Sequence, residues 1–139
     1  MRQLITGVDE KGRSCVVAEH PLGDLPERSP MLTTFTSPSD PMPRPPGTGE
    51  SVDLQVPPGV TKLAMARWTS DFAYGMHHTD TIDFDTILEG SATLVLDDGP
   101  HLLERGDVAV VTGVDHAWQA GPEGTTISFV FLGTPAPRA

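Results

Sequence analysis

The second half of the chain alternates short apolar runs with glycine and aspartate turns. Strands are expected there over residues 61–69, 79–88, 91–97, 101–104, 107–112, 115–120 and 125–132. The clearest turns between them are Glu89-Gly90 and Asp97-Asp98-Gly99. No segment shows the apolar period of about 3.6 residues that marks an amphipathic helix. Many short strands joined by regular turns predict an all-β sandwich or barrel.

The first part of the chain follows a different pattern. Residues 2–19 predict a hairpin, because apolar runs flank Asp9-Glu10-Lys11-Gly12 and the glycine tolerates the positive φ of a tight reversal. Ten of the fourteen prolines lie between Pro21 and Pro58, and proline lacks the amide donor that a central strand needs. Met31–Thr36 predicts one more short strand. We expect three regions: a hairpin and Pro-rich arm over 1–60 that packs on the barrel or on a partner subunit, a barrel core over 61–133, and a frayed tail over 134–139.

Length and composition are consistent with one β-rich domain. The 139 residues match the usual size of a single domain, about 100 to 200 residues. Nineteen acidic against nine basic residues give a formal net charge of -10. No Lys/Arg cluster is present that could follow a phosphate backbone or an anionic bilayer. Nucleic acid and membrane surfaces are therefore not expected partners.

The cysteine content and the length of the apolar runs bear on where in the cell the protein is expected. The single Cys15 has no second cysteine for an intrachain disulfide, and the chain does not open with the charged and apolar regions of a signal peptide. The apolar runs are far shorter than the roughly 20 residues that cross a bilayer. We expect a cytoplasmic protein.

One predicted strand is polar along a single face. Residues two apart on a strand share a face, and one such face bears His77, Thr79, Thr81 and Asp83. Ile82 and Phe84 take the opposite face. The strand therefore has an apolar side to bury, and its polar side faces either solvent or an internal cavity.

A second segment combines an apolar strand, a glycine turn and an imidazole. It runs from Gly106 to Trp118, and it places His116 and Trp118 two residues apart on one face. Nearby residues are assigned structural roles: His78 points away from the cavity, Arg67 forms an ion pair, and Trp68 belongs to the core.

These two segments resemble the two motifs of the cupin family, whose members are small jelly-roll β-barrels. His77 takes the place of the first motif's first His, Asp83 that of its Glu, and Gly90 that of its closing Gly, six residues further on. Gly106, Gly113 and His116 take the places of two glycines and the His of the second motif. The resemblance covers about residues 61–132. It implies a single-domain cupin barrel, similar to a subgroup of small bacterial cupins with a His-x-Thr-x-Thr-Ile-Asp-aromatic run, a Gly-x-x-His-Ala-Trp run and a long N-terminal arm.

The sequence departs from the cupin pattern at four places. Thr79 replaces the second His of the first motif, and Asp71, Val111 and Ala120 replace a Gly, the Pro and the Asn. Of the family's metal set of three His and one Glu, the resemblance leaves His77, Asp83 and His116. Two imidazoles and a carboxylate suit a divalent metal such as Fe, Mn, Ni or Zn, whereas the shorter Asp and the missing His argue against a tight site.

The same residues also suit a metal-free site. In a barrel interior, His77 or His116 would have a pKa near neutrality while Asp83 holds the tautomer, which makes a general acid/base. Thr79 and Thr81 would then orient the polar groups of a substrate, and Trp118 would supply an aromatic wall. Metal-bound and metal-free sites both remain open at this point.

The leading expectation is an enzyme acting on a small organic molecule, a lyase or isomerase of the dehydratase or decarboxylase kind. His77 and His116 would exchange protons and Asp83 would orient or ligate. One alternative is an Fe(II)-dependent dioxygenase, and another is a cupin that binds a ligand without turnover. Exposed sheet edges and the resemblance to cupins imply a homodimer.

Overall fold

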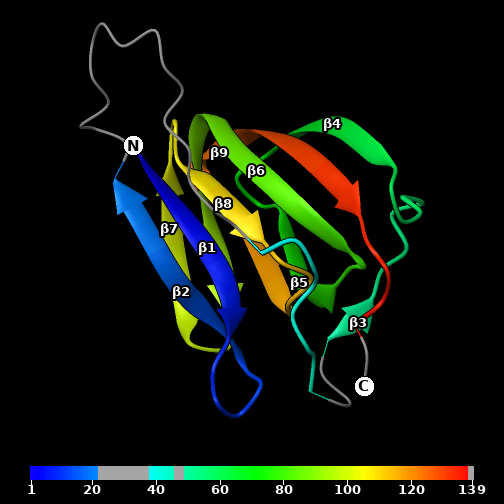
Figure 1. Ribbon diagram of the computed structural model, residues 1–139. Helices are drawn as coiled ribbons and strands as arrows, with labels where there is room; N and C mark the ends of the chain where they lie inside the picture. Colours follow the sequence, from blue (N-terminus) through cyan, green and yellow to red (C-terminus); the bar gives the residue numbers. More distant parts are fainter. Residues whose placement is uncertain (22–37, 46–48, 138–139) are drawn as a thin grey trace, which may run out of the picture.

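The computed structural model describes residues 1–21, 38–45 and 49–137, which form strands and no helix (Figure 1). The strands are β1 (Arg2–Val8), β2 (Ser14–Pro21), β3 (Glu50–Ser51), β4 (Thr61–Trp68), β5 (Ala73–His78), β6 (Thr81–Leu96), β7 (Gly99–Glu104), β8 (Val108–Val111) and β9 (His116–Gly133). The predicted all-β class is therefore confirmed. Within the described ranges, no helix is long and apolar enough to span a membrane.

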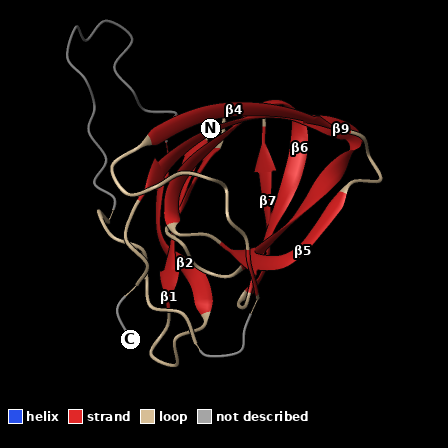
Figure 2. Ribbon diagram, turned by 90° about the vertical axis from the view of Figure 1, so that its right-hand side faces the viewer, coloured by secondary structure: helices blue, strands red, loops and turns tan. Residues whose placement is uncertain are grey.

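The strands form one curled sheet in the order β2-β1-β8-β6-β9-β5-β3, with β4 added on β9 and β7 on β6. Figure 2 shows the sheet bending round an interior, in a half-barrel consistent with the jelly-roll barrel that the motifs imply. Strands β6 and β9 are paired along most of their length, from Thr81 opposite Gly133 to Val95 opposite Ala117. They hold the two motif segments in one frame, because β5 and β8 pair with β9 and β6 respectively.

Two expected turns are bends inside long strands. The sequence predicts separate strands on either side of Glu89-Gly90, but β6 runs through this point with register shifts at Ile87/Glu89 and Gly90/Ala92. Gly90 has φ +69, and a Cβ atom there would lie 2.1 Å from the Gly124 carbonyl oxygen. Strand β9 likewise joins the expected 115–120 and 125–132. A glycine bulge bends a paired strand without ending its ladder, so the predicted breaks are wrong.

The polar segment is divided between two strands. The sequence predicts one strand from residue 79 to 88, whereas β5 ends at His78 and β6 starts at Thr81. Thr79 and Asp80 lie between the two strands and belong to neither. The Thr134 amide donates to the Asp80 carbonyl oxygen at 3.1 Å. Thr134, the first residue of the tail that the sequence analysis expects to be frayed, is thus hydrogen-bonded and buried.

The N-terminal hairpin is confirmed as β1 and β2, which pair antiparallel. Its turn contains Gly12 at φ +74, and the Asp9 carboxylate accepts hydrogen bonds from the amides of Lys11 and Arg13 at 2.8 and 3.0 Å. Strand β1 also pairs in parallel with β8. The hairpin therefore extends the sheet of its own chain. The strand expected over Met31–Thr36 lies outside the described residues.

An apolar core fills one end of the half-barrel. Its most buried members come from β6, β7, β8 and β9, and include Leu94, Leu103, Val111, Trp118 and Ile127. Burying each such side chain contributes about 1.5–3 kcal/mol to stability. Trp118 and the half-buried Trp68 and Phe129 lie at the border of this cluster, so the core forms one side of the interior cavity described below.

A short segment of the arm extends the edge of the sheet beside β5. Residues 49–56, called the strap here, contain β3, which pairs in parallel with β5. The Val52 amide donates to the His78 carbonyl oxygen at 2.9 Å, and Lys62 Nζ donates to the Leu54 carbonyl oxygen at 3.1 Å. These bonds hold the strap beside the residues of the first motif.

Candidate functional site

A cavity of about 280 Å³ lies between the strap and strands β4, β5, β6 and β9. Its lining residues are Val52, Leu54, Trp68, Phe72, Tyr74, His77, Thr79, Asp83, His116, Trp118, Phe129 and Phe131. The polar members are all buried, at 2–8% exposure, whereas Val52, Leu54, Trp68 and Phe72 are half-buried. The cavity therefore has a polar floor and an aromatic and aliphatic rim.

The two motif histidines meet on this floor. His77, at the end of β5, pairs with His116, at the start of β9. The centroids of their rings lie 4.2 Å apart with an interplanar angle of 49°. The pairing of β5 with β9 thus brings together two residues that are far apart in the sequence, as the motif resemblance implies.

Backbone carbonyls determine the tautomer of each imidazole. His77 Nδ1 lies 2.9 Å from the Gly75 carbonyl oxygen, and His116 Nδ1 lies 2.8 Å from the Val114 carbonyl oxygen. A carbonyl only accepts hydrogen bonds, so Nδ1 carries the hydrogen and the neutral ring keeps a lone pair on Nε2. The sequence prediction that Asp83 holds the tautomer is wrong. Each histidine has a basic nitrogen that is free of these backbone bonds.

Burial keeps both imidazoles neutral. Loss of solvent and, to a smaller extent, the neighbouring His77 together lower the pKa of His116 to about 3. The pKa of His77 is lowered as well, mainly by burial, although the hydrogen bond to Gly75 opposes this shift. A buried cation without a carboxylate partner is unfavourable. His77 is 8% exposed and His116 is 2% exposed, so burial penalises a proton on His77 less than one on His116.

A chain of hydroxyl groups leads to Asp83. Thr79 Oγ1 and Thr81 Oγ1 are 2.8 Å apart, and Thr81 Oγ1 donates to Asp83 Oδ1. Burial raises the pKa of Asp83 to about 7, although the hydrogen bond from Thr81 opposes this shift. Asp83 and Thr79 line the cavity, whereas Thr81 lies behind them as their link. At neutral pH, Asp83 can both donate and accept a proton.

Asp85 is a buried acid that the sequence interpretation did not include. It is fully buried, and neither of its carboxylate oxygens has a hydrogen-bond partner among the described residues. Burial, reinforced by the nearby Asp83, raises the pKa of Asp85 well above its usual value. The two-residue period of a strand could have predicted this position, since Asp85 follows Thr81 and Asp83 on the same face.

The aromatic wall is larger than the sequence predicts. Trp118 lines the cavity, and so does Trp68, which the sequence assigns simply to the core. Trp68 stacks on Phe72 at 4.4 Å and tilts against Trp118 and Phe129 at 5.9 Å in both contacts, and Phe129 stacks on Phe131 at 5.4 Å. Tyr74 meets His77 edge-on at 4.6 Å. These rings come from three strands and one turn, so no local pattern predicts their meeting.

His78 forms a separate, partly buried pair beside the cavity. Its Nδ1 lies 2.8 Å from Asp115 Oδ1, and the His78 side chain is 14% exposed. It does not line the cavity, in agreement with its opposite strand parity. The strap begins in close contact with this pair: a Cβ atom added to Gly49 would lie only 2.2 Å from Asp115 Oδ1. The pair therefore helps to shape the path of the strap.

The described residues do not assemble the three-ligand metal site that the resemblance implies. Nowhere in the ranges 1–21, 38–45 and 49–137 do three His, Cys, Asp or Glu side chains group closely enough to hold a metal ion. His77 and His116 approach each other as a pair, whereas Thr81 engages Asp83. The donor set in this arrangement does not fit a tightly bound divalent metal.

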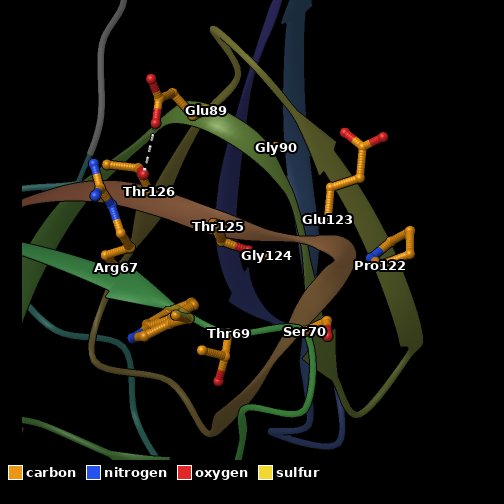
Figure 3. A pocket seen from close by; sticks show the side chains of 11 residues that line it. Arg67, Thr69, Ser70, Glu89, Gly90, Pro122, Glu123, Gly124, Thr125 and Thr126 are labelled. Carbon is orange, nitrogen blue, oxygen red and sulfur yellow. Dashed lines mark hydrogen bonds between the residues drawn. The ribbon is translucent and has the colours of Figure 1, made fainter.

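A larger pocket of about 450 Å³, called the outer pocket here, lies where the end of β4 meets the bends of β6 at Gly90 and of β9 at Gly124 (Figure 3). Its lining includes the exposed Arg67, and Glu89 accepts a hydrogen bond from Thr126 Oγ1 at 3.0 Å. None of the predicted site residues lines it. We therefore place the candidate site in the smaller interior cavity.

No protein-family profile matches the chain. Two curated fungal proteins are similar to a part of it. Phomopsin biosynthesis cluster protein C' of Diaporthe leptostromiformis is 49% identical over 45 residues, which are 32% of this chain and 24% of that protein. Oryzines biosynthesis cluster protein J of Aspergillus oryzae is 43% identical over 44 residues, 31% of this chain and 25% of that protein. The matched segment thus spans about a quarter of these relatives.

Several solved structures also resemble this chain. A cupin-2 domain protein of Shewanella frigidimarina has 24% identity, a TM-score of 0.42, and coverage of 56% of this chain and 69% of its own. A sugar phosphate isomerase from the cupin superfamily of Silicibacter pomeroyi has 22% identity, TM-score 0.47 and coverage of 54% and 52%. A DMSP lyase of Ruegeria pomeroyi has 18% identity, TM-score 0.49 and coverage of 56% and 41%. The first two of these proteins are described as cupins.

Proposed function

We propose that this chain is a small cupin-type enzyme, a lyase or isomerase that moves protons on an organic substrate. The observation that carries the proposal is the pair of buried imidazoles on the cavity floor. Both rings donate from Nδ1 to a backbone carbonyl, so in the neutral form of each ring Nε2 carries the lone pair that can accept a proton. A positioned pair of bases beside a carboxyl group is the equipment of general acid/base catalysis.

The proposed roles follow from the proton affinities of the groups. His77 Nε2 takes a proton from a carbon next to a carbonyl group, because His77 is the less buried of the two imidazoles. Protonated Asp83, whose pKa lies at about 7, donates to the carbonyl oxygen or to a leaving hydroxyl. His116 Nε2 accepts a hydrogen bond from a substrate hydroxyl. In an isomerisation of a hydroxy ketone, protonated His77 returns its proton to the former carbonyl carbon, while ionised Asp83 takes the proton of the hydroxyl on the neighbouring carbon, which becomes the new carbonyl. In a dehydration water leaves, protonated His77 loses its proton to solvent and Asp83 takes one up.

The surroundings support chemistry on a small molecule. The cavity is at the lower end of the sizes typical of ligand pockets, roughly 300–1,000 Å³. The two curated relatives carry names that place them in biosynthesis clusters for phomopsin and oryzines. A role in small-molecule biosynthesis is in keeping with these names.

Exchange of carbon-bound hydrogen tests this function directly. The purified protein is incubated in D₂O with 1-tetralone, a ketone with exchangeable α-hydrogens, under anaerobic conditions with EDTA. Mass spectrometry is expected to show faster deuterium uptake than in buffer. The His77→Gln, His116→Gln double variant should fall to the buffer rate. Arg67→Ala, which alters only the outer pocket of Figure 3, should keep the wild-type rate.

Three results would overturn the proposal. Full exchange in the double variant would remove the histidines from the mechanism. Turnover that needs a metal and oxygen would favour the dioxygenase alternative. Ligand binding without exchange, across a panel of ketones and hydroxy ketones, would favour a non-catalytic binding protein.

A further inference from the structure

Aromatic rings dominate the walls of the interior cavity. Six of its twelve lining residues are Trp, Tyr or Phe, and Val52 and Leu54 add an aliphatic side from the strap. Phe129 and Phe131 are nearly parallel, with an interplanar angle of 11°, and the angle between Trp68 and Phe72 is 14°. Such a wall favours a flat ligand, because offset-stacked rings gain about 0.5–1.5 kcal/mol beyond the area that they bury.

No residue that lines this cavity is Lys or Arg, within the described part of the chain. The nearest basic side chains are directed elsewhere. Arg44 is bound to Asp80 at 2.8 Å and to the Gly113 carbonyl at 3.1 Å. Lys62 donates to the backbone of the strap, and Arg67 lines the outer pocket. A carboxylate or phosphate entering the cavity would lose water without gaining a fixed positive charge, which is costly.

The polar groups of the cavity are confined to its floor. Thr79, Asp83 and His116 are 2–3% exposed, whereas Tyr74 at the rim is 41% exposed. A ligand that fills the space therefore meets hydrogen-bonding groups at its inner end and rings along its sides. This arrangement matches a molecule with a hydroxyl or carbonyl group at one end of a flat apolar body.

We propose that the cavity selects uncharged aromatic ligands carrying a hydroxyl or carbonyl group, and disfavours carboxylates and sugar phosphates. The inference names the substrate class for the proposed function and takes the same cavity as the site. It concerns binding, so it is tested without turnover.

Four probes separate aromaticity from charge. The probes are 2-naphthol, 2-naphthoate, cyclohexanol and glucose 6-phosphate, and calorimetry at pH 7 measures each affinity. We expect 2-naphthol to bind about tenfold or more tightly than each of the other three. Trp68 lines both this cavity and the outer pocket, whereas Trp118 lines this cavity and not the outer pocket. In a Trp68→Phe variant Trp118 is the one tryptophan left in the sequence, so a change in its fluorescence locates the bound probe in the cavity.

A charge placed at the rim provides a gain-of-function test. Leu54→Arg should strengthen 2-naphthoate binding by about tenfold, because a guanidinium then faces the carboxylate. The matched control is Leu63→Arg, which adds the same charge at a 70% exposed position on β4 outside the cavity. It should leave every affinity unchanged. Phe72→Leu, at the half-buried rim, should weaken 2-naphthol several-fold and leave cyclohexanol unaffected.

Two outcomes would overturn the inference. One is 2-naphthoate or glucose 6-phosphate binding to the wild-type protein as tightly as 2-naphthol. The other is equal gains of 2-naphthoate binding in Leu54→Arg and Leu63→Arg. Repeating the titrations with the His77→Gln, His116→Gln variant separates this inference from the proposed function. If the variant still prefers 2-naphthol, the proposed ligand class is supported even when no deuterium exchange is found. If the wild-type protein exchanges 1-tetralone and cyclohexanone at equal rates, the proposed function is supported and the ligand class is contradicted.

Discussion

At the scale of single residues, the main property of the site is that burial favours the uncharged forms of its histidine and aspartate side chains. His116 would ordinarily be half-protonated at pH 6.5, and burial moves its pKa to about 3. Asp83 shifts in the opposite direction, from 3.8 to about 7. Both shifts favour the uncharged form of the group, as expected in a low-dielectric interior. At neutral pH both imidazoles on the cavity floor are therefore uncharged, and Asp83 is divided between its protonated and ionised forms.

These opposite shifts predict opposite effects on stability between pH 5 and pH 7. An unfolded chain protonates His116 as the pH falls below 6.5 and the folded protein does not, so this residue costs stability at pH 5. The unfolded chain ionises Asp83 above pH 3.8 and the folded protein resists up to about 7, so this residue costs stability at pH 7.

Urea unfolding of His116→Asn and Asp83→Asn at the two pH values measures these costs. Relative to the wild-type protein, His116→Asn should gain more at pH 5 than at pH 7. Asp83→Asn should gain more at pH 7 than at pH 5. Each difference is expected to be on the order of 1–2 kcal/mol. Changes of the same sign in both variants would contradict the assignment of neutral groups on the floor.

At the scale of elements, the two longest strands owe their length to glycine bends. Gly90 stands where the resemblance to the first cupin motif expects a closing glycine, and in the structure it lets β6 turn beside β9 without breaking the ladder. The sequence signals a change of direction at this point correctly. It does not distinguish a turn from a bulge, because the two differ only in whether a partner strand continues to pair.

Substitution of Gly90 should therefore be severe. Gly90→Ala is expected to lower the free energy of unfolding by about 3 kcal/mol, because the residue has φ +69 and its new Cβ would overlap the Gly124 carbonyl oxygen. The matched control is Gly75→Ala, a position in β5 with no atom within 4 Å of the added Cβ. It should change stability by less than about 0.5 kcal/mol. Equal losses in thermal or urea unfolding would show that Gly90 is not a special position.

At the scale of the whole molecule, the curvature of the half-barrel determines which side chains lie close enough together to bind one metal ion. It brings His77 and His116 to one floor, and it directs Asp83 to a hydroxyl chain. Purified protein without a His-tag, expressed in metal-supplemented medium, is therefore expected to hold well below one equivalent of iron, manganese, nickel or zinc by elemental analysis. His116→Ala provides the comparison. Near one equivalent of metal in the wild-type protein, lost in the variant, would contradict this expectation.

The sequence by itself determined the features that depend on local periodicity. The alternation of apolar and polar residues specified an all-β chain, the N-terminal hairpin and the shared face of Thr79, Thr81 and Asp83, because neighbouring residues on a strand occupy opposite faces. The same alternation extends to Asp85. The motif places of His77 and His116 brought the two histidines into one hypothesis, although their tautomers were assigned to the wrong partner.

Only the tertiary structure decided the features that depend on pairing between distant segments. The register of β5 against β9 sets His77 beside His116, and backbone carbonyls near each ring select its tautomer. The rings of Trp68 and Phe129 meet because β4 and β9 are neighbours. Burial then sets the charge of every group on the floor. These properties arise from contacts across the sheet, and local periodicity carries no information about which strands will become neighbours.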